Sequence, residues 1–401
     1  MPDRKQTHAR PADGTLDAVV AGGGIVGAAA CLALVTRGDR VRWFRPALAT
    51  PQLPDGFAAR IYALSPGNLG WLERLGVVTH LDTARLGSVR QMRIRARHGH
   101  GLDLSAEQAG AAELALIIES DNLLRALEAA LAEAGVAAAE PVETRIVALQ
   151  DRADAPPTPH TLELGLDAGE VLSTRLLVAA DGAASPLRDL AGIPTTGVDY
   201  AHRAVVANFT CERDHRGIAC QWFDNGAVLA WLPLPDRHIS MVWSLPQTRA
   251  EALLELDADA LTAQVGAAGE HRWGGLKLVS PPQSFPLRRK RAKQLTASRM
   301  ALVGDAAHVV HPLAGQGMNL GLRDVRALLE ATDGRRDPGD AYALARYEAL
   351  RQTDVHSIEA VTDGLFRLFG SPLGGFLGGH GMGVLNHLAP VKSELIRQAM
   401  R

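Results

Sequence analysis

The first part of the chain alternates short apolar runs with turn residues, in an order that predicts a strand, a helix and a second strand. Residues 17–21 form the first run, a block of three glycines follows, and apolar residues then continue to about Val35. A second short run covers residues 41–44. Residues 18–36 carry no charge and are long enough to cross a bilayer, but three adjacent glycines break a helix at a cost of about 1 kcal/mol each. We therefore predict a βαβ unit that begins a parallel sheet.

Apolar residues at helical spacing predict two further helices in the first half. One begins after Ser65-Pro66, an N-cap residue followed by proline at the first helical position, and ends near Gly76. The other begins near Ser120 and ends at Gly135. In both segments the start and stop signals agree with the period of the apolar residues.

Later segments predict buried strands and an antiparallel meander. Unbroken apolar runs at residues 176–180 and 300–304 are typical of central strands, and helices dominate from about Gly317 onward. Between these runs lie four segments rich in β-branched and aromatic residues: 204–211, 217–223, 227–234 and 238–245. Turn residues separate the last three of them, so we predict an antiparallel meander inserted into the first domain.

Composition narrows the class of protein. The 401 residues include 44 acidic and 42 basic side chains, a balance that argues against nucleic-acid binding, which depends on a positive excess. Cys31, Cys211 and Cys220 form no CxxC pair and no even set, so we expect a reduced, cytoplasmic environment. The polar residues 1–16 lack the apolar segment of a signal peptide, and we interpret them as a disordered N-terminal extension.

A glycine motif follows the first predicted strand and begins the helix: Gly22-x-Gly24-x-x-Gly27, with Ile25 and Val26 inside it. Gly22 permits a tight turn, Gly24 lets the backbone approach a pyrophosphate, and Gly27 lets the helix pack closely on the strand. The helix N-terminus then presents unpaired N–H groups to phosphate charge. The alternative is a glycine-rich packing turn without a ligand, which the strand–turn–helix context disfavours.

One expected partner of this motif is absent. A dinucleotide site of this type places an acid at the end of the second strand, where it accepts hydrogen bonds from the ribose hydroxyls. Arg45 fills this position here, and a guanidinium only donates. Either the adenosine is held more weakly or by other groups, or the strand ends at a different residue.

A second turn places an aspartate directly after a buried strand, where α/β sheets bind ligands. Asp181-Gly182 ends the strand at 176–180, and Ser185 then caps a short helix that carries Arg188, a donor suited to phosphate. The alternative at this turn is a capped helix with no ligand.

A third turn repeats this arrangement near residue 304. Gly304-Asp305 ends a buried strand, and the glycine loop at 315–317 begins a helix whose N–H groups could stabilise a developing anion. A metal site at His308 and His311 is disfavoured, since no nearby Cys, Asp or Glu completes a ligand shell.

Together the three motifs resemble those of the group A flavoprotein aromatic hydroxylases, which have the para-hydroxybenzoate-hydroxylase fold. The run HPLAGQGMNLGLRD at residues 311–324 narrows the resemblance to the UbiH/UbiF/VisC-type ubiquinone-biosynthesis hydroxylases. The resemblance extends over nearly the full length, with further matching segments at residues 59–65, 199–200, 285–287, 362–365 and 390–400. It implies an α/β fold in which a Rossmann-like FAD-binding domain carries an inserted antiparallel-sheet substrate domain and a C-terminal helical segment.

On this basis we assign domains along the chain. The FAD-binding domain is discontinuous and comprises residues 17–75, 100–195 and 286–355. The substrate domain comprises residues 76–99 and 196–285, and a C-terminal helical region follows at 356–401.

The resemblance also implies which residues bind FAD. The glycine motif would hold the ADP portion, Arg60 and Arg125 would lie near the flavin or its pyrophosphate, and Asp305 would contact the flavin-side ribose. Pro312 would lie beside the reacting face of the ring, and loop 315–319 would approach the flavin pyrimidine, where a helix N-terminus favours the reduced anion. The full predicted cofactor set is Gly22, Gly24, Ile25, Val26, Gly27, Arg45, Arg60, Arg125, Asp181, Gly182, Arg188, Gly304, Asp305, Gly315, Gln316, Gly317, Met318 and Asn319.

The implied reaction is hydroxylation of the aromatic ring of a polyprenylated phenol or benzoquinol, with no side chain assigned as catalyst. NAD(P)H or another donor reduces FAD, O₂ forms a flavin C4a-hydroperoxide, and its distal oxygen is transferred to the ring. The chain has no second strand–GxGxxG–helix pattern, so the resemblance implies transient docking of NAD(P)H near Arg188. Gln221, Phe223 and Trp231 on the meander are candidates for substrate contacts, and the strand register leaves the choice open.

Two segments bear on membrane association. We interpret the basic cluster 288–291 with Lys293 first as a solvated face, with attraction to an anionic membrane surface as the alternative. Residues 368–391 contain no Asp, Glu, Lys or Arg, and Phe369 and Phe376 there either cover the core or face lipid. The resemblance is compatible with peripheral association at the inner membrane or with a quinone-biosynthesis complex.

Two other functions stay open at this point. One is another FAD-dependent aromatic hydroxylase or oxidoreductase of the same fold, although the halogenase signature Trp-x-Trp-x-Ile-Pro is absent. The other is a flavin-free accessory protein, which only Arg45 suggests. An absorbance spectrum of the purified protein distinguishes the accessory protein from both enzymes.

Overall fold

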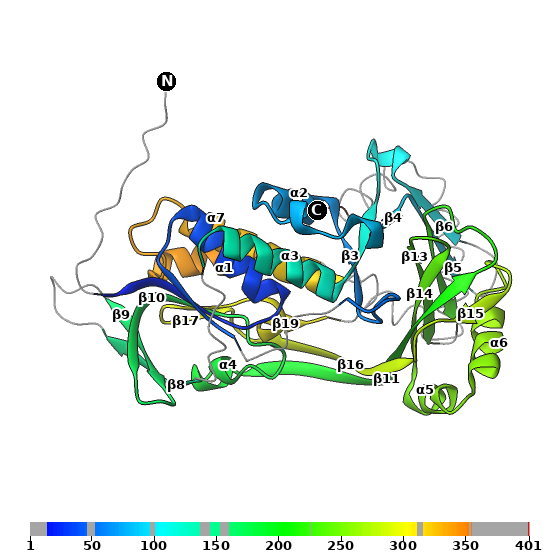
Figure 1. The fold of residues 1–401 in the computed structure, drawn as a ribbon. Helices are drawn as coiled ribbons and strands as arrows, with labels where there is room; N and C mark the ends of the chain where they lie inside the picture. Colours follow the sequence, from blue (N-terminus) through cyan, green and yellow to red (C-terminus); the bar gives the residue numbers. More distant parts are fainter. Residues whose placement is uncertain are drawn as a thin grey trace, which may run out of the picture.

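The first three elements form the predicted βαβ unit (Figure 1). β1 (Leu16–Ala21) pairs in parallel with β2 (Val41–Phe44), and α1 (Ile25–Arg37) connects them. α1 ends at Gly38, whose φ of +102° is a left-handed conformation that glycine adopts easily because it has no Cβ atom. The computed structural model describes residues 14–45, 53–96, 101–136, 145–152, 160–224, 226–310, 316–352, 354 and 400.

A seven-stranded sheet contains the strands that precede the three motifs. β10 (Val171–Ala179) lies between β1 and β18 (Met300–Leu302) and is parallel to both. Ala179 is opposite Ala21 in β1 and opposite Leu302 in β18, so these strands end at the same level. The remaining strands of this sheet are β2, β8 (Ile146–Arg152), β9 (Thr161–Leu166) and β17 (Thr296–Ala297). The turns after β1, β10 and β18 therefore meet at one edge.

Helices cover one face of this sheet. α1, α3 (Ser120–Glu133) and α7 (Gln316–Thr332) lie side by side over it, and α2 (Pro66–Arg74) lies beyond them (Figure 1). As predicted, the side chain of Ser65 caps α2. The strand residues beneath the helices, such as Val20, are fully buried, so the sheet edge is held by a packed core.

The predicted antiparallel meander is part of a nine-stranded sheet. β12 (Ile218–Asp224), β13 (Ala227–Leu234) and β14 (His238–Pro246) are antiparallel neighbours, and β11 (Thr195–Cys211) pairs with β14. The other strands of this sheet are β5 (Gln91–Ala96), β6 (Gly101–Ser105), β15 (Leu276–Leu278), β16 (Gln283–Ala292) and β19 (His308–Val309). β5 pairs in parallel with β12, a long-range contact that no local pattern indicates.

The strands divide the chain differently from the predicted boundaries at two places. β6 lies within the range predicted for FAD binding, yet it forms an antiparallel hairpin with β5 in the nine-stranded sheet. β4 (Gly87–Val89) lies within the range predicted for the substrate domain, yet it pairs with β7 (Ala115–Glu119). β7 also pairs with β3 (Ile61–Leu64), which completes a three-stranded sheet. In both places strand pairing overrides position in the sequence.

Two long strands connect the two ends of the molecule. β11 and β16 run antiparallel to each other from the seven-stranded sheet into the nine-stranded sheet (Figure 1). α5 (Gln247–Leu254) and α6 (Ala258–Ala268) pack on the outer face of the nine-stranded sheet, over a core that includes Trp231 and Trp243. The shorter helical segments are η1 (Val78–His80), η2 (Thr83–Arg85), η3 (Glu107–Ala109), α4 (Pro186–Leu190) and η4 (Gly304–Ala306).

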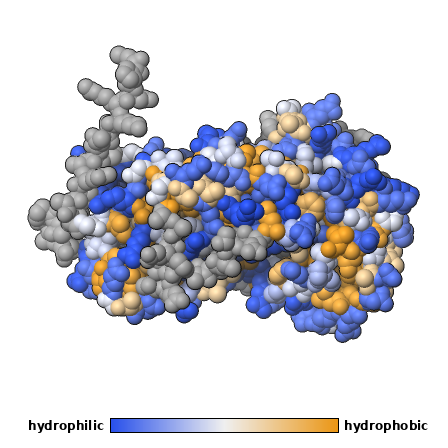
Figure 2. Space-filling view, in the orientation of Figure 1, coloured by the Kyte–Doolittle hydropathy of each residue, from blue (hydrophilic) through white to orange (hydrophobic). Residues whose placement is uncertain are grey.

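The described surface is mixed in polarity (Figure 2), and the cysteines are buried. Within the described ranges, no helix is long and apolar enough to span a membrane. On the face shown in Figure 2, apolar side chains are scattered in small groups among polar ones, as is usual for protein surfaces. The three cysteines are free and buried, and burial raises the pKa of Cys31 to about 12, so its thiol is unreactive.

Some predictions fall outside the described residues. They include Pro312, Gly315, Phe369, Phe376 and nearly all of the predicted C-terminal helical region. β1 begins at Leu16, the last residue of the range predicted as the N-terminal extension, and residues 1–13 of that range lie outside the described residues.

Candidate active site

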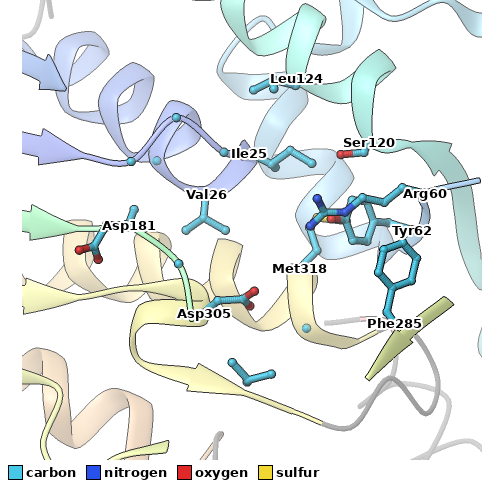
Figure 3. A pocket seen from close by; sticks show the side chains of 18 of the residues that line it. Ile25, Val26, Arg60, Tyr62, Ser120, Leu124, Asp181, Phe285, Asp305 and Met318 are labelled. Carbon is cyan, nitrogen blue, oxygen red and sulfur yellow. The ribbon is translucent and has the colours of Figure 1, made fainter. Parts of the chain in front are cut away.

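The three predicted turns line a single cavity of about 2700 Å³. Gly22–Gly24 follow β1, Asp181 follows β10 and Asp305 follows β18, and Figure 3 shows both aspartates beside the first turn of α1. Across the cavity lie residues of β3, α7 and the inner face of the nine-stranded sheet. The parallel register of the three strands produces this convergence, because it brings their carboxyl ends to one place.

The glycine turn has two different reasons for lacking side chains. A Cβ atom on Gly22, at φ +141°, would lie 2.0 Å from the carbonyl oxygen of Ala180, and one on Gly27 would lie 2.2 Å from that of Gly22. A Cβ atom on Gly24 would meet nothing within 4 Å, so that position is open toward the cavity. Gly24 is also the N-cap of α1 and supplies no side-chain cap, which leaves the helix N–H groups available to an anion.

Asp181 faces the cavity, and only one of its two carboxylate oxygens accepts a hydrogen bond from the protein. Its Oδ2 accepts a hydrogen bond from the N–H of Leu187 at 3.1 Å, while its buried Oδ1 has no hydrogen-bond partner. Burial raises the pKa of this carboxyl, against the opposing effect of Ser185. An unsatisfied buried acceptor at a strand end suits a ligand hydroxyl.

Arg188 does not line the cavity. Its side chain is 1% exposed, and its Nη1 donates to the carbonyl oxygens of Ala183 at 3.2 Å and Ala306 at 3.1 Å. Arg188 therefore ties the second turn to the third, which makes it a positioning residue for both aspartates. Its burial, which the sequence does not indicate, removes it from the direct phosphate contact that its charge suggests.

Asp305 is open to the cavity but surrounded by protein. The desolvation that results raises its pKa, although His308 and Arg60 act in the opposite direction. The adjacent Gly304 adopts a φ of +62°, and its N–H donates to Oδ2 of Asp324 at 2.8 Å. Asp324 thus holds the turn through its backbone, and the Asp305 carboxylate stays available to bind a ligand.

A buried charge network supports this turn. Asp324 is fully buried and contacts Nε2 of His308 at 2.8 Å and Nε of Arg351 at 2.7 Å. Burial alone would raise the pKa of Asp324, but His308, Arg351 and the Gly304 N–H hold it below its usual value. His308 is engaged by Asp324, and no group of three His, Cys, Asp or Glu side chains in the described ranges could hold a metal ion.

Arg60 reaches the cavity from a loop that a buried carboxylate holds in place. Its guanidinium lies 5.7 Å from the ring centre of Tyr62, and both side chains line the cavity (Figure 3). The fully buried Glu119 accepts hydrogen bonds from Nε of Arg85 at 2.6 Å and from the N–H of Ala58 at 2.6 Å. This anchoring restricts the loop, so Arg60 is presented from a defined position.

The remaining predicted residues that the structure describes lie at the cavity, in the core or on the surface. Gly317 and Met318 line the cavity, whereas Arg125 is exposed on α3 and does not. Asn319 is buried, and its amide accepts from the N–H of Ser65 at 2.9 Å and donates to the carbonyl of Ala63 at 2.7 Å. Asn319 therefore anchors α7 to β3 rather than facing the cavity.

The inner face of the nine-stranded sheet forms the opposite wall. Gln221 of β12, Ala230 of β13, Val242 of β14 and Val206 of β11 stand opposite one another in register and all line the cavity. Neighbouring positions add small or apolar side chains: Ala204, Val228, Leu232 and Ser244. Gln221 is 8% exposed, and no hydrogen bond of its amide to another described residue is found.

Of the three suggested substrate contacts, Gln221 alone reaches the cavity. Trp231 lies on the outer face of the sheet, where its ring packs edge-on against Phe209 with the centroids 5.6 Å apart. Phe223 packs with Leu102 and Val228. Ser120 and Glu128 also line the cavity, belong to no motif and were not predicted as site residues. Tyr62 and Phe285 line it from two of the matching segments, although the sequence assigned them no role.

Arg45 occupies the position that the sequence predicts for it. β2 ends at Phe44, and Arg45 follows directly and lines the cavity. Its guanidinium lies 5.1 Å from the ring centre of Trp43 and forms an ion pair with Glu128 of α3. The strand therefore does not end at a different residue, and a base stands where such sites usually have an acid.

Comparison with known proteins decides which nucleotide this site holds. The model of the FAD binding domain matches residues 15–358. The chain belongs to this FAD-binding family. The ubiquinone hydroxylase UbiL of Rhodospirillum rubrum is 32% identical to it, over 97% of this chain and 90% of the relative. The 3-demethoxyubiquinol 3-hydroxylase of Escherichia coli is also 32% identical, over 88% of this chain and 90% of the relative.

Solved structures show the same fold. PqsL of Pseudomonas aeruginosa, in complex with 2-aminobenzoylacetate, has a TM-score of 0.73 at 22% identity and covers 92% of this chain and 100% of its own. HpxO of Klebsiella pneumoniae, in complex with FAD and uric acid, has a TM-score of 0.70 at 19% identity and covers 96% and 97%. The predicted fold class and the FAD cofactor are confirmed, and the chain is an FAD-dependent monooxygenase.

The residues present fit FAD. The open position at Gly24, the uncapped N-terminus of α1 and the unsatisfied Oδ1 of Asp181 are suited to a diphosphate and to sugar hydroxyls. Asp305 lies farther along the same cavity, and Gly317 and Met318 begin the helix beyond it.

Proposed function

We propose that the protein hydroxylates the aromatic ring of a polyprenylated phenol or benzoquinol intermediate of ubiquinone biosynthesis. The observation that carries the proposal is one cavity in which three polar turns face an almost entirely apolar sheet surface. The polar turns suit a flavin nucleotide, and the apolar wall suits a prenylated ring. The hydroxylase relatives from Rhodospirillum rubrum and Escherichia coli support this choice of substrate class.

The chain's own residues bind and orient the cofactor. The N–H groups at the start of α1 would hold the diphosphate, and Asp305 would accept hydrogen bonds from the hydroxyls of the flavin side chain. Gly317 and Met318 would lie against the flavin, with the N-terminus of α7 stabilising negative charge there. When bound, FAD supplies the activation of O₂ and the transfer of one oxygen atom.

Gln221 would orient the substrate ring. Its carboxamide is a buried polar group among small and apolar neighbours, and it can donate to or accept from a ring hydroxyl. Ala230 and Ala204 leave room beside it, and the valines of the same wall exclude water from the reacting ring.

NAD(P)H would reduce the flavin by transient docking. The guanidinium of Arg188 is engaged with two carbonyls, so docking would use an exposed donor instead. Arg288 lines the cavity and is exposed, with its Nε 3.0 Å from Asp199. We expect faster flavin reduction by NADH or NADPH in the wild type than in Arg288→Ala, and equal rates would exclude Arg288 from this role.

Peripheral membrane association belongs to the same proposal. Polyprenylated substrates partition into lipid, and β16 presents the basic run at 288–291. Co-sedimentation with anionic vesicles, weakened by added salt, is the expected result. Binding that is equal on neutral vesicles would contradict an electrostatic attraction.

The function is tested by flavin content and by the intermediates that accumulate in a deletion strain. The purified full-length protein should show a flavin absorption spectrum, and the deletion strain should accumulate an under-hydroxylated prenyl-phenol, detected by mass spectrometry. The wild-type gene should restore ubiquinone, and a Gly24→Ala gene should restore less. A folded protein without flavin, or an unchanged quinone profile, would overturn the proposal.

A further inference from the structure

The base at the end of β2 leaves the adenosine ribose without its usual acceptor. Sites of this type bind the ribose hydroxyls through a strand-end carboxylate, because hydroxyl donors need an acceptor. Arg45 holds that position and offers donors only. A buried sugar hydroxyl left unpaired costs about 1–3 kcal/mol, so a tightly bound FAD requires an acceptor from elsewhere.

The carboxylate that lines the same part of the cavity comes from α3. Glu128 stands one helical turn after Leu124, and both line the cavity along with Arg45 and Phe44. Residues four apart on a helix share a face, so α3 presents an apolar and an acidic side chain together. The ion pair with Arg45 brings this carboxylate to the end of β2, although the two residues are 83 positions apart.

The pair is partly buried and held from both sides. The side chains of Arg45 and Glu128 are 17% and 21% exposed. Arg45 lies over the ring of Trp43, whose Nε1 donates to the carbonyl oxygen of Gly22 at 2.8 Å. The glycine turn, β2 and α3 are thus linked through these side chains, and the acid lies beside the turn that receives the diphosphate.

We propose that Glu128 accepts the hydrogen bonds of the adenosine ribose and that Arg45 positions its carboxylate. A carboxylate has about four lone-pair sites. Arg45 contacts Oε1, and no contact of Oε2 with another described residue is found, so Oε2 is available to a ribose hydroxyl. The acid that such sites usually carry at the end of the second strand is here Glu128 on α3. The strand-end position is occupied by Arg45, a base that binds this acid. The inference rests on the proposed function only in taking FAD as the nucleotide.

The test compares FAD with analogues that lack the 2′- or the 3′-hydroxyl of the adenosine. Affinities are measured with the full-length protein, freed of flavin, by quenching of flavin fluorescence. We expect the wild type to prefer FAD over at least one analogue by about tenfold, the effect of one hydrogen bond to a charged group. In Glu128→Gln this preference should fall to about twofold or less.

A matched control separates this effect from general damage to α3. Glu133→Gln makes the same change at the end of the helix, where the carboxylate contacts His80 and does not line the cavity. Glu133→Gln should prefer FAD over the analogues as strongly as the wild type does. The proposal is overturned if Glu128→Gln prefers FAD over the analogue as strongly as the wild type does. It is also overturned if the wild type shows no preference for FAD over either analogue. An equal loss of affinity for FAD and for both analogues in Glu128→Gln also overturns it, because an analogue that lacks a contacted hydroxyl should lose less affinity than FAD does.

The role of Arg45 is tested in the same way. In Arg45→Met the ribose preference should fall to a value between those of the wild type and Glu128→Gln, since the carboxylate remains but is no longer held. An unchanged preference would show that Arg45 does not position Glu128. These outcomes are independent of hydroxylation, so a failure here is distinguishable from a failure of the proposed function, in which the wild type binds no flavin or hydroxylates no prenyl-phenol.

Discussion

The glycines of the first turn show how differently two residues of one motif can act. Gly22 is required by packing, because any Cβ atom would overlap the carbonyl of Ala180, and its φ of +141° disfavours other residues. Gly24 has an ordinary extended backbone, with φ −84° and ψ 178°, and open space at its Cβ position. Packing therefore gives no reason for a glycine at this position, and we expect its missing side chain to serve the ligand.

This difference predicts opposite outcomes for two alanine substitutions. Gly22→Ala should lower the free energy of unfolding by about 3 kcal/mol, because a main-chain overlap must be relieved. Gly24→Ala should leave it within about 1 kcal/mol but weaken FAD binding by about tenfold or more. Denaturant unfolding of the flavin-free protein and fluorescence titration measure the two effects. Equal damage to stability by both substitutions would refute the distinction.

The aspartates that face the cavity carry a cost in stability. Burial raises the pKa of Asp305, so the folded protein favours the neutral acid and loses stability as pH rises through the usual carboxyl pKa of about 4 toward the raised value. Asp305→Asn should therefore raise the melting temperature of the flavin-free protein at pH 7, and this gain should disappear below about pH 4. FAD affinity should fall in the same variant. A stability gain that persists in acid would contradict the assignment.

At the scale of elements, strand alternation determines what faces the cavity. Gln221 and Ala230 point inward, while Trp222 and Trp231, the next residues of the same strands, belong to the core on the outer face. A shift of one residue in the register of β12 or β13 would exchange these faces.

A bulky residue on the inner face should block the substrate and spare the cofactor. Ala230→Phe would fill the wall between Gln221 and Val242, and we expect hydroxylation to fall by about a hundredfold with flavin content unchanged. Ala260→Phe, on the exposed side of α6, is the control and should have no effect. Product formation and the flavin spectrum are the two measurements. Full activity in Ala230→Phe would place the substrate elsewhere.

At the scale of the whole molecule, the cavity lies between parts of all three sheets. Residues of β1, β3, β10, β12 and β14, or of the turns that follow them, line it, and β11 and β16 connect its two sides. FAD bound there would contact segments that are distant in the sequence, so its binding energy adds to the stability of the folded chain.

Removal of the flavin should therefore destabilise the entire described fold. FAD at a hundredfold excess over its Kd contributes about 2.7 kcal/mol to the free energy of unfolding. The melting temperature should fall when the flavin is removed and recover in proportion to the logarithm of added FAD, as measured by calorimetry. A melting temperature that does not respond to FAD would contradict a site shared among the sheets.

The local features of this protein follow from the sequence alone. The βαβ opening, the cap at Ser65, the limits of β2 and β13, and the position of each motif at a strand end are all correct. They depend on apolar period and on glycine, proline and aspartate chemistry, which act between residues close together in the chain.

Tertiary structure alone decided which side chains share a site. The pairing of Arg45 with Glu128, the burial of Arg188 between two carbonyls and the inward face of Gln221 join residues that lie far apart in the sequence or depend on strand register. No local pattern encodes such contacts, because they arise only when separate elements pack against each other and each side chain takes the space that its neighbours leave.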